Sequence, residues 1–245
     1  MALMELLAAR FGSRPRIAIT GCGGKTSLMI ALAEEYARRG RSVLMTTTTK
    51  VRSPYELDYG CDVVQLDSYD HVPHCGERVF FAMTYDGRKV RSPELALLAE
   101  IADGYDAVLM EADGSRGLPL KYHNPWDPVI PRFTTDVVAI VGMSALDRPL
   151  DDATVFNYGA YLDASADTDV TVSERTILNL LRLDEGIRKG FADSDGVADR
   201  RGVVFFNQCD ILAPERLARA MASLGTGHLY GSVEKDVVYG EPVGV

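Results

Sequence analysis

One short segment of the chain combines glycines with a lysine and two hydroxyl side chains, the set of groups that can hold a nucleotide phosphate. Glycine allows backbone N–H groups to approach phosphate closely, lysine neutralises the β and γ oxygens, and the hydroxyl after it can bind Mg²⁺. We predict that Lys25 is catalytic and that Thr26 is a Mg²⁺ ligand; the alternative is a glycine-rich turn with an exposed lysine. The predicted phosphate-binding residues are Gly21, Cys22, Gly23, Gly24, Lys25, Thr26 and Ser27.

Two carboxylates follow the apolar segment 106–110. Glu111 and Asp113 are separated by one residue, so on an extended chain both face the same side. At the carboxyl edge of a parallel sheet they would lie where ligands bind. We predict that both are catalytic: one holds Mg²⁺, with Asp113 assigned as the ligand, and the other polarises an attacking water. The alternative is an Asp-Gly turn with a solvated Glu111.

Two further motifs could contact a nucleotide. In GTPases an Asn-Lys-x-Asp motif recognises guanine; here Asn207 and Asp210 are present, but Gln208 replaces the lysine. The motif therefore leaves ATP and GTP both open, and an Asx turn capping the next helix is the alternative. Within the segment 46–50 we assign Thr48 and Lys50 to ligand binding, although threonine also simply suits strands.

The elements around these motifs alternate between strands and helices. A strand at 16–20, a glycine loop, a helix at 25–39 and a strand at 42–46 form a βαβ unit. Continuous apolar segments predict strands buried on both faces. The fold class expected is α/β, a three-layer P-loop NTPase-like fold with a mostly parallel sheet and helices on both faces. We predict a single domain over 1–245, with a middle insertion at about 52–91 and a long loop at 114–132. Further strands are predicted at 61–66, 78–85, 106–110, 136–141 and 202–206, and further helices at 3–11, 92–103, 173–182 with an extension over 185–190, and 213–224.

The composition is that of a folded, acidic protein. With 26 Lys and Arg against 35 Asp and Glu, the net charge of −9 disfavours nucleic acid as the main partner. No apolar run approaches the roughly 18 residues of a membrane-spanning helix, and the first residues do not resemble a signal peptide. Four cysteines without a CxxC pair favour reduced thiols. We therefore predict a cytoplasmic protein without a membrane partner.

Several motifs together resemble the YqeC family, described as selenium-dependent hydroxylase accessory proteins or selenium cofactor biosynthesis proteins. The phosphate loop alone is generic, and its shortened spacing is similar to that of Mur-ligase ATPases. The resemblance implies a nucleotide-binding accessory factor for molybdenum hydroxylases that carry labile selenium, with such a hydroxylase or its cofactor-insertion machinery as partner. The motifs that carry it are ITGCGGKTS at 19–27, TTTTK at 46–50, EADGSRGLPLK at 111–121 and DPVIP at 127–131.

Three functions remain compatible with these residues. The first is a Mg²⁺-dependent ATPase or GTPase with slow turnover, in which Arg116 is the best candidate for an arginine finger. The second is a nucleotide-gated chaperone without significant hydrolysis. The third is a nucleotide-dependent transferase that modifies a molybdenum or selenium cofactor, with the segments 46–50 and 121–123 binding a second, anionic substrate.

Overall fold

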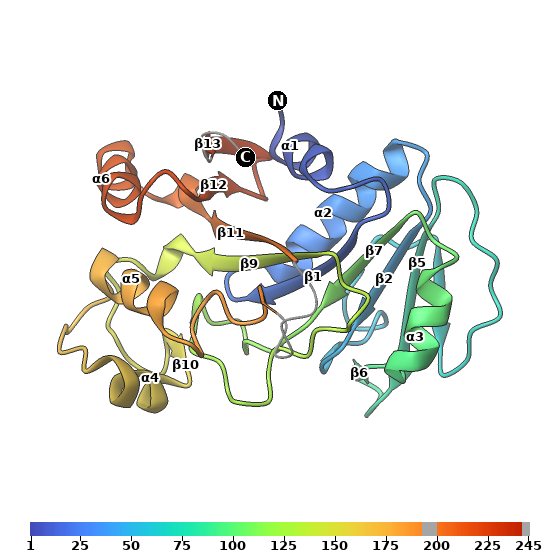
Figure 1. Cartoon of the computed structure of the whole chain (residues 1–245), viewed down its shortest axis with the longest axis horizontal. Coiled ribbons are helices and arrows are strands. Elements are labelled where there is room, and N and C mark those ends of the chain that lie inside the picture. The colour runs from blue at the N-terminus through green and yellow to red at the C-terminus, as the bar shows by residue number, and fades with distance from the viewer. Residues whose placement is uncertain (193–199, 242–245) are drawn as a thin grey trace.

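Five parallel strands form the centre of the protein, and their carboxyl ends meet at one edge (Figure 1). The structure is a computed structural model that describes residues 1–192 and 200–241. Each of the five strands pairs in parallel with its neighbours, so the residues that follow them come together at that edge. In spatial order they are β11 (Arg201–Asn207), β9 (Asp136–Gly142), β1 (Arg16–Gly21), β7 (Ala107–Glu111) and β2 (Val43–Thr47).

Further strands extend this sheet on both sides. Within the described residues it has eleven strands. Beyond β2 lie the parallel strands β5 (Arg78–Thr84) and β4 (Val63–Leu66), then the antiparallel β6 (Lys89–Arg91) and β3 (Val51–Arg52). Beyond β11 lie β12 (Leu229–Ser232) and β13 (Val237–Gly240). A separate pair is formed by β8 (Leu120–Lys121) and β10 (Val155–Phe156).

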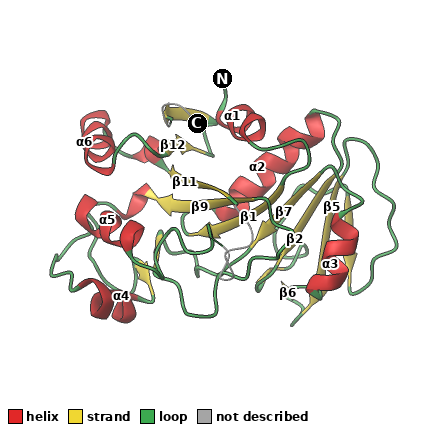
Figure 2. Cartoon of the chain, in the orientation of Figure 1, coloured by secondary structure: helices red, strands yellow, loops and turns green. Residues whose placement is uncertain are grey.

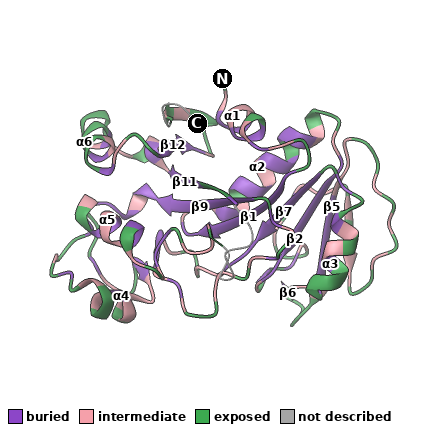
Figure 3. Ribbon diagram, viewed as in Figure 1, coloured by how far each residue is buried: buried purple, intermediate pink, exposed green. Residues whose placement is uncertain are grey.

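Helices cover both faces of the sheet, which gives three layers (Figure 2). Alternate residues of one strand enter different clusters: Ile17 and Ile19 of β1 pack with one group of helices, and Ala18 faces the opposite side. Both faces of the central strands are therefore buried, as Figure 3 shows, and a continuous apolar run is what such strands need. The first face carries α1 (Leu3–Arg10) and α2 (Lys25–Arg38), and the other carries α3 (Leu95–Ala102), α4 (Tyr158–Ser165), α5 (Glu174–Arg182) and α6 (Pro214–Leu224).

These observations confirm the predicted α/β class and the βαβ unit, and they correct several elements. The helix predicted at 92–103 begins only at Leu95, because Glu94 is still extended. No helix continues over 185–190, since Leu183 turns extended directly after α5. Helix α4 and the strands β12 and β13 were not predicted. Residues 52–91 hold β4, β5 and β6, which extend the main sheet, and the segment 114–132 contains β8.

In the described parts of the chain, no helix combines the length and the apolar character that crossing a bilayer requires.

Candidate functional site

The glycine loop leaves β1 in a left-handed turn and enters α2 at Lys25. Gly21 and Gly23 have φ angles of 83° and 92°. A Cβ atom on Gly21 would lie 2.2 Å from the carbonyl oxygen of Ile140, and one on Gly23 would lie 2.4 Å from the Cα of Gly142. Both contacts are with backbone atoms of β9, so only glycine fits at these two positions. The neighbouring strand thus fixes the course of the loop.

The loop presents a run of unpaired backbone donors. The first two N–H groups bind within the protein: Gly21 donates to Asp113 Oδ2 at 2.9 Å and Cys22 donates to the carbonyl of Ile140 at 2.9 Å. The next five N–H groups, from residues 23–27, have no acceptor within 1–192 or 200–241. They stand at the N-terminus of a 14-residue helix, where the helix dipole also favours negative charge. This arrangement is suited to an anion.

The ammonium group of Lys25, at the start of α2, is kept protonated by two neighbouring carboxylates. Its Nζ lies 3.0 Å from Asp113 Oδ1 and 3.9 Å from Glu111 Oε1, and it donates to the carbonyl of Gly21 at 2.6 Å. Burial by itself would lower the pKa of this ammonium, but the carboxylates of Asp113 and Glu111 outweigh burial and raise it. Lys25 therefore stays protonated while it lines the cavity.

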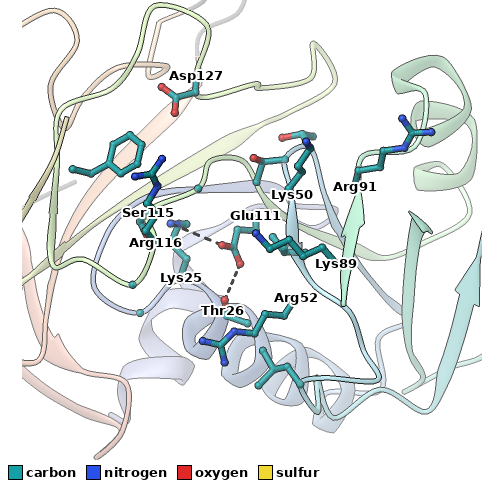
Figure 4. Close-up of a pocket in the computed structure, with 18 of the residues that line it drawn as sticks. Lys25, Thr26, Lys50, Arg52, Lys89, Arg91, Glu111, Ser115, Arg116 and Asp127 are labelled. Atoms are coloured by element: carbon teal, nitrogen blue, oxygen red, sulfur yellow. Dashed lines mark hydrogen bonds and ion pairs between the residues drawn. The ribbon is translucent and has the colours of Figure 1, made fainter. Parts of the chain in front are cut away.

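Glu111 and Thr26 form a pair of oxygen ligands beside the loop. Thr26 Oγ1 donates to Glu111 Oε2 at 2.8 Å, and both residues line the same cavity. Figure 4 shows Glu111 between Lys25 and Thr26. Burial raises the pKa of Glu111, and the charge of Lys25 opposes that rise only in part. A cation placed here would stabilise the ionised carboxylate.

Asp113, predicted as a Mg²⁺ ligand, lies behind the loop rather than in the cavity. Its side chain is 0% exposed, and four groups surround it: Lys25, the N–H of Gly21, Lys121 and His123. Lys121 Nζ lies 3.4 Å and His123 Nε2 lies 2.8 Å from Asp113 Oδ2. Burial opposes ionisation, but Lys25, His123 and Lys121 together lower the pKa of Asp113. This carboxylate positions Lys25 and the loop.

A cavity of about 1110 Å³ opens in front of the loop. Gly23, Gly24, Lys25, Thr26 and Ser27 form its floor. Its lining contains six basic side chains against two carboxylates, Glu111 and Asp127, although the chain as a whole has a net charge of −9. The six are Lys25, Lys50, Arg52, Lys89, Arg91 and Arg116 (Figure 4). The cavity is therefore positive in an acidic protein, and it suits an anionic ligand.

Three residues of the threonine-rich segment line the cavity, namely Thr48, Thr49 and Lys50. Ligand binding by Thr48 and Lys50 stays a prediction, and Thr48 Oγ1 donates to the carbonyl of Val129 at 2.6 Å. Thr46 and Thr47 are fully buried and donate to the carbonyls of Phe81 and Glu111. These two hydroxyls hold neighbouring chain segments in place.

Asn207, the last residue of β11, forms hydrogen bonds both with the phosphate loop and with the residue that follows β12. Its Nδ2 donates to the carbonyl of Gly23 at 2.8 Å, and its Oδ1 accepts the N–H of Val233 at 2.9 Å. Gln208 lines the cavity beside the loop, whereas Asp210 lies outside the cavity lining. Asn207 therefore holds the phosphate loop in place, whereas contact of Asn207 or Asp210 with a nucleotide stays a prediction.

Cys22 is a buried filler within the loop. Its side chain does not line the cavity, and burial raises its thiol pKa to about 12. Since the thiolate is the reactive form, we expect Cys22 in the native protein to resist a small thiol reagent at pH 8, while the exposed Cys75 reacts. Mass spectrometry of the labelled peptides checks this. Labelling of Cys22 as fast as Cys75 would contradict the buried placement.

Three of the six basic residues that line the cavity were not predicted from the sequence, namely Arg52, Lys89 and Arg91. Their signal is weak: each stands next to a single valine, Val51 or Val90, in two very short strands. Conversely, the region 121–123, which was a candidate for binding a second substrate, does not line the cavity. Lys121 and His123 are only 2% and 1% exposed, since both surround Asp113. Lys121 and His123 therefore do not serve as substrate contacts in this cavity, as the transferase hypothesis had assumed.

The fold and the loop together define an α/β protein with a P-loop-like, three-layer architecture. The family model described as YqeC protein matches residues 17–159, and the chain belongs to the YqeC family. A curated relative, the uncharacterized protein YqeC of Escherichia coli (strain K12), is 30% identical over 181 residues, which cover 71% of this chain and 70% of the relative. No solved structure matches the chain.

Proposed function

We propose that this protein binds ATP or GTP together with Mg²⁺ in the positive cavity and hydrolyses it slowly. The observation that carries the proposal is the run of five unpaired N–H groups at the N-terminus of α2, next to Lys25. Backbone donors, a helix dipole and a fixed ammonium are the elements that a polyphosphate requires. The cavity in front of them, at about 1110 Å³, accommodates a whole nucleotide.

The residues beside the loop fit a Mg²⁺ ion that is shared with phosphate oxygens. Mg²⁺ prefers oxygen ligands and keeps several waters, so one hydroxyl and one carboxylate suffice when phosphates complete the shell. Thr26 and Glu111 supply that pair. No cluster of three or more His, Cys, Asp and Glu side chains suited to a metal occurs in the described residues, so an all-protein site is not the proposal. The ion would neutralise charge on the transferred phosphate.

Slow turnover follows from the limited number of groups that can stabilise the transferred phosphate. Lys25 is fixed by Asp113, and Glu111 orients the water or the metal. Arg116 lies in the cavity lining and is exposed, with its guanidinium 5.5 Å from the centre of the Phe156 ring. A loosely held arginine supplies transition-state charge inefficiently until something fixes it.

The biological setting is part of the same proposal. We infer an accessory role in the cytoplasm, in the maturation of selenium-dependent molybdenum hydroxylases, with a hydroxylase or its cofactor-insertion machinery as the partner. Membership of the YqeC family supports this setting, whereas the loop and the cavity support the nucleotide step.

Calorimetric titration with non-hydrolysable ATP and GTP analogues tests the nucleotide step. In the presence of Mg²⁺ we expect binding to the wild type, and binding weakened roughly tenfold or more in Lys25→Ala, because the variant lacks the ammonium that donates charge-assisted hydrogen bonds to phosphate. Omitting Mg²⁺ should also weaken binding. The two analogues together show which base is preferred.

Lys235→Ala is the matched control, since Lys235 is exposed and lies outside the cavity lining. Circular dichroism confirms that each variant is folded. No binding to a folded wild type, or equal binding to wild type and Lys25→Ala, would refute the proposal. Tight binding with no phosphate release above background would instead favour the nucleotide-gated chaperone.

A further inference from the structure

The cavity has a second group of cations that belongs to other elements than the phosphate loop. Lys50, Arg52, Lys89 and Arg91, here called the basic wall, come from β3, β6 and the residue before β3. All four line the cavity, and Figure 4 shows them on the side of Glu111 away from Arg116. The phosphate loop and the Mg²⁺ ligands proposed above include none of these four side chains.

The register of β3 and β6 places like charges opposite one another. The two strands are antiparallel, with Val51 opposite Val90 and Arg52 opposite Lys89. The valines are 7% and 1% exposed, so they anchor the strands in the core and direct the basic side chains outward. Like charges directly across an antiparallel pair destabilise it. An anion bound between them would remove this repulsion.

The four side chains of the basic wall have no ion-pair partner in the part of the chain that the structure describes. Within residues 1–192 and 200–241, none of its four side chains forms an ion pair with a carboxylate. The Lys50 ammonium lies over the ring of Tyr85, 3.7 Å from its centre, which holds the lysine in place without neutralising it. Four positive charges without an ion pair among the described residues, inside one cavity of a chain with net charge −9, mark a place for external negative charge.

We propose that the basic wall binds a second small molecule that carries a phosphate or diphosphate group, while the phosphate loop holds the nucleotide. Two arginines in the set favour phosphate, because guanidinium groups bind its oxygens in pairs. The cavity volume of about 1110 Å³ exceeds the range typical of a pocket for one small molecule, so two ligands have room. The concave site and the net charge of −9 favour a small molecule over nucleic acid or a membrane surface.

This inference shares the cavity with the proposed function but rests on different residues, so the two can fail separately. The probe is inorganic pyrophosphate, titrated calorimetrically into protein already saturated with the preferred nucleotide analogue and Mg²⁺. We expect pyrophosphate to bind the wild type and to bind Arg52→Gln/Lys89→Gln about 100-fold more weakly, at roughly tenfold for each cationic side chain replaced. The same double variant should be at least as heat-stable as the wild type, because it removes a like-charged pair.

Arg88→Gln/Arg219→Gln is the matched control: it removes the same charge from exposed positions outside the cavity lining and should bind pyrophosphate as the wild type does. No pyrophosphate binding while the loop is filled, or equal binding by both double variants, would overturn the proposal. A loss of nucleotide affinity in Arg52→Gln/Lys89→Gln as large as in Lys25→Ala would assign the wall to the nucleotide instead. If the wild type binds no nucleotide, pyrophosphate is titrated into Lys25→Ala instead. Binding that is lost when Arg52 and Lys89 are also replaced would support the basic wall as a phosphate site, independently of the nucleotide proposal.

Discussion

Replacing Asp113 with alanine is expected to lower the free energy of unfolding by about 3–5 kcal/mol, because it leaves buried positive charge without its partner. Lys25 and Lys121 are 3% and 1% exposed at their side chains, and both face this carboxylate. His123 and the N–H of Gly21 lose an acceptor as well. Urea denaturation at pH 7 measures the change.

Two further variants separate charge from shape. Asp113→Asn keeps the size of the side chain and removes only its charge, so a large loss in this variant shows that the charge is what matters. Asp62→Asn, in the partly exposed ion pair with Arg78, is the matched control and should cost about 1 kcal/mol or less. Equal losses in Asp113→Asn and Asp62→Asn would contradict the dependence of the buried lysines on Asp113.

The pH profile gives an independent measure of the same interaction. Folding lowers the pKa of Asp113 below its unfolded value of about 3.8. The stabilisation is therefore complete above the unfolded pKa and is lost as the pH falls through the lower, folded pKa. Stability of the wild type should fall on acidification below about pH 4, and the stability of Asp113→Asn should fall less over the same interval.

The sequence was sufficient for the central strands because their signals are local. The strand at 16–20, the glycine loop and the helix from Lys25 each have a pattern of their own, and chain order alone gives a βαβ unit. The order of the strands was not predictable, since β7 lies between β1 and β2 only in the folded sheet. That order is what brings Glu111 beside Thr26.

The role of Asp113 required the structure for the same reason. In the sequence, Asp113 cannot be distinguished from Glu111, because both are carboxylates at the end of the same predicted strand, two residues apart. In the fold, Glu111 reaches the cavity, and the chain turns Asp113 behind the loop to meet Lys121 and His123 from a later segment. Neither the spacing nor the composition of the sequence indicates that Asp113 contacts Lys121 and His123. Arg52 and Lys89 were not predicted as site residues for the same reason, because only the register of β3 and β6 makes them neighbours.

Replacing Glu111 with glutamine is expected to reduce single-turnover hydrolysis by about 100-fold or more, the usual effect of removing one fixed electrostatic group from a reaction centre. The amide keeps the shape and can still accept a hydrogen bond from Thr26, so only the negative charge is lost. Binding of the nucleotide analogue should change far less than hydrolysis, because the loop N–H groups and Lys25 remain. Release of γ-phosphate with enzyme in excess over nucleotide measures the rate.

The pH dependence of the wild-type rate follows from the same carboxylate. Burial raises the pKa of Glu111 above its ordinary 4.5, so the ionised form is lost at a higher pH than for a solvated glutamate. A bound Mg²⁺ would stabilise the ionised form, so protons and Mg²⁺ compete for Glu111. At low Mg²⁺, hydrolysis should therefore decline on acidification at a higher pH than at saturating Mg²⁺, and the residual rate of Glu111→Gln should lack this dependence. Glu215→Gln, at an exposed position of α6, is the control that should keep the wild-type rate and profile. A wild-type rate in Glu111→Gln would exclude Glu111 from the reaction and leave hydrolysis to the loop and Lys25.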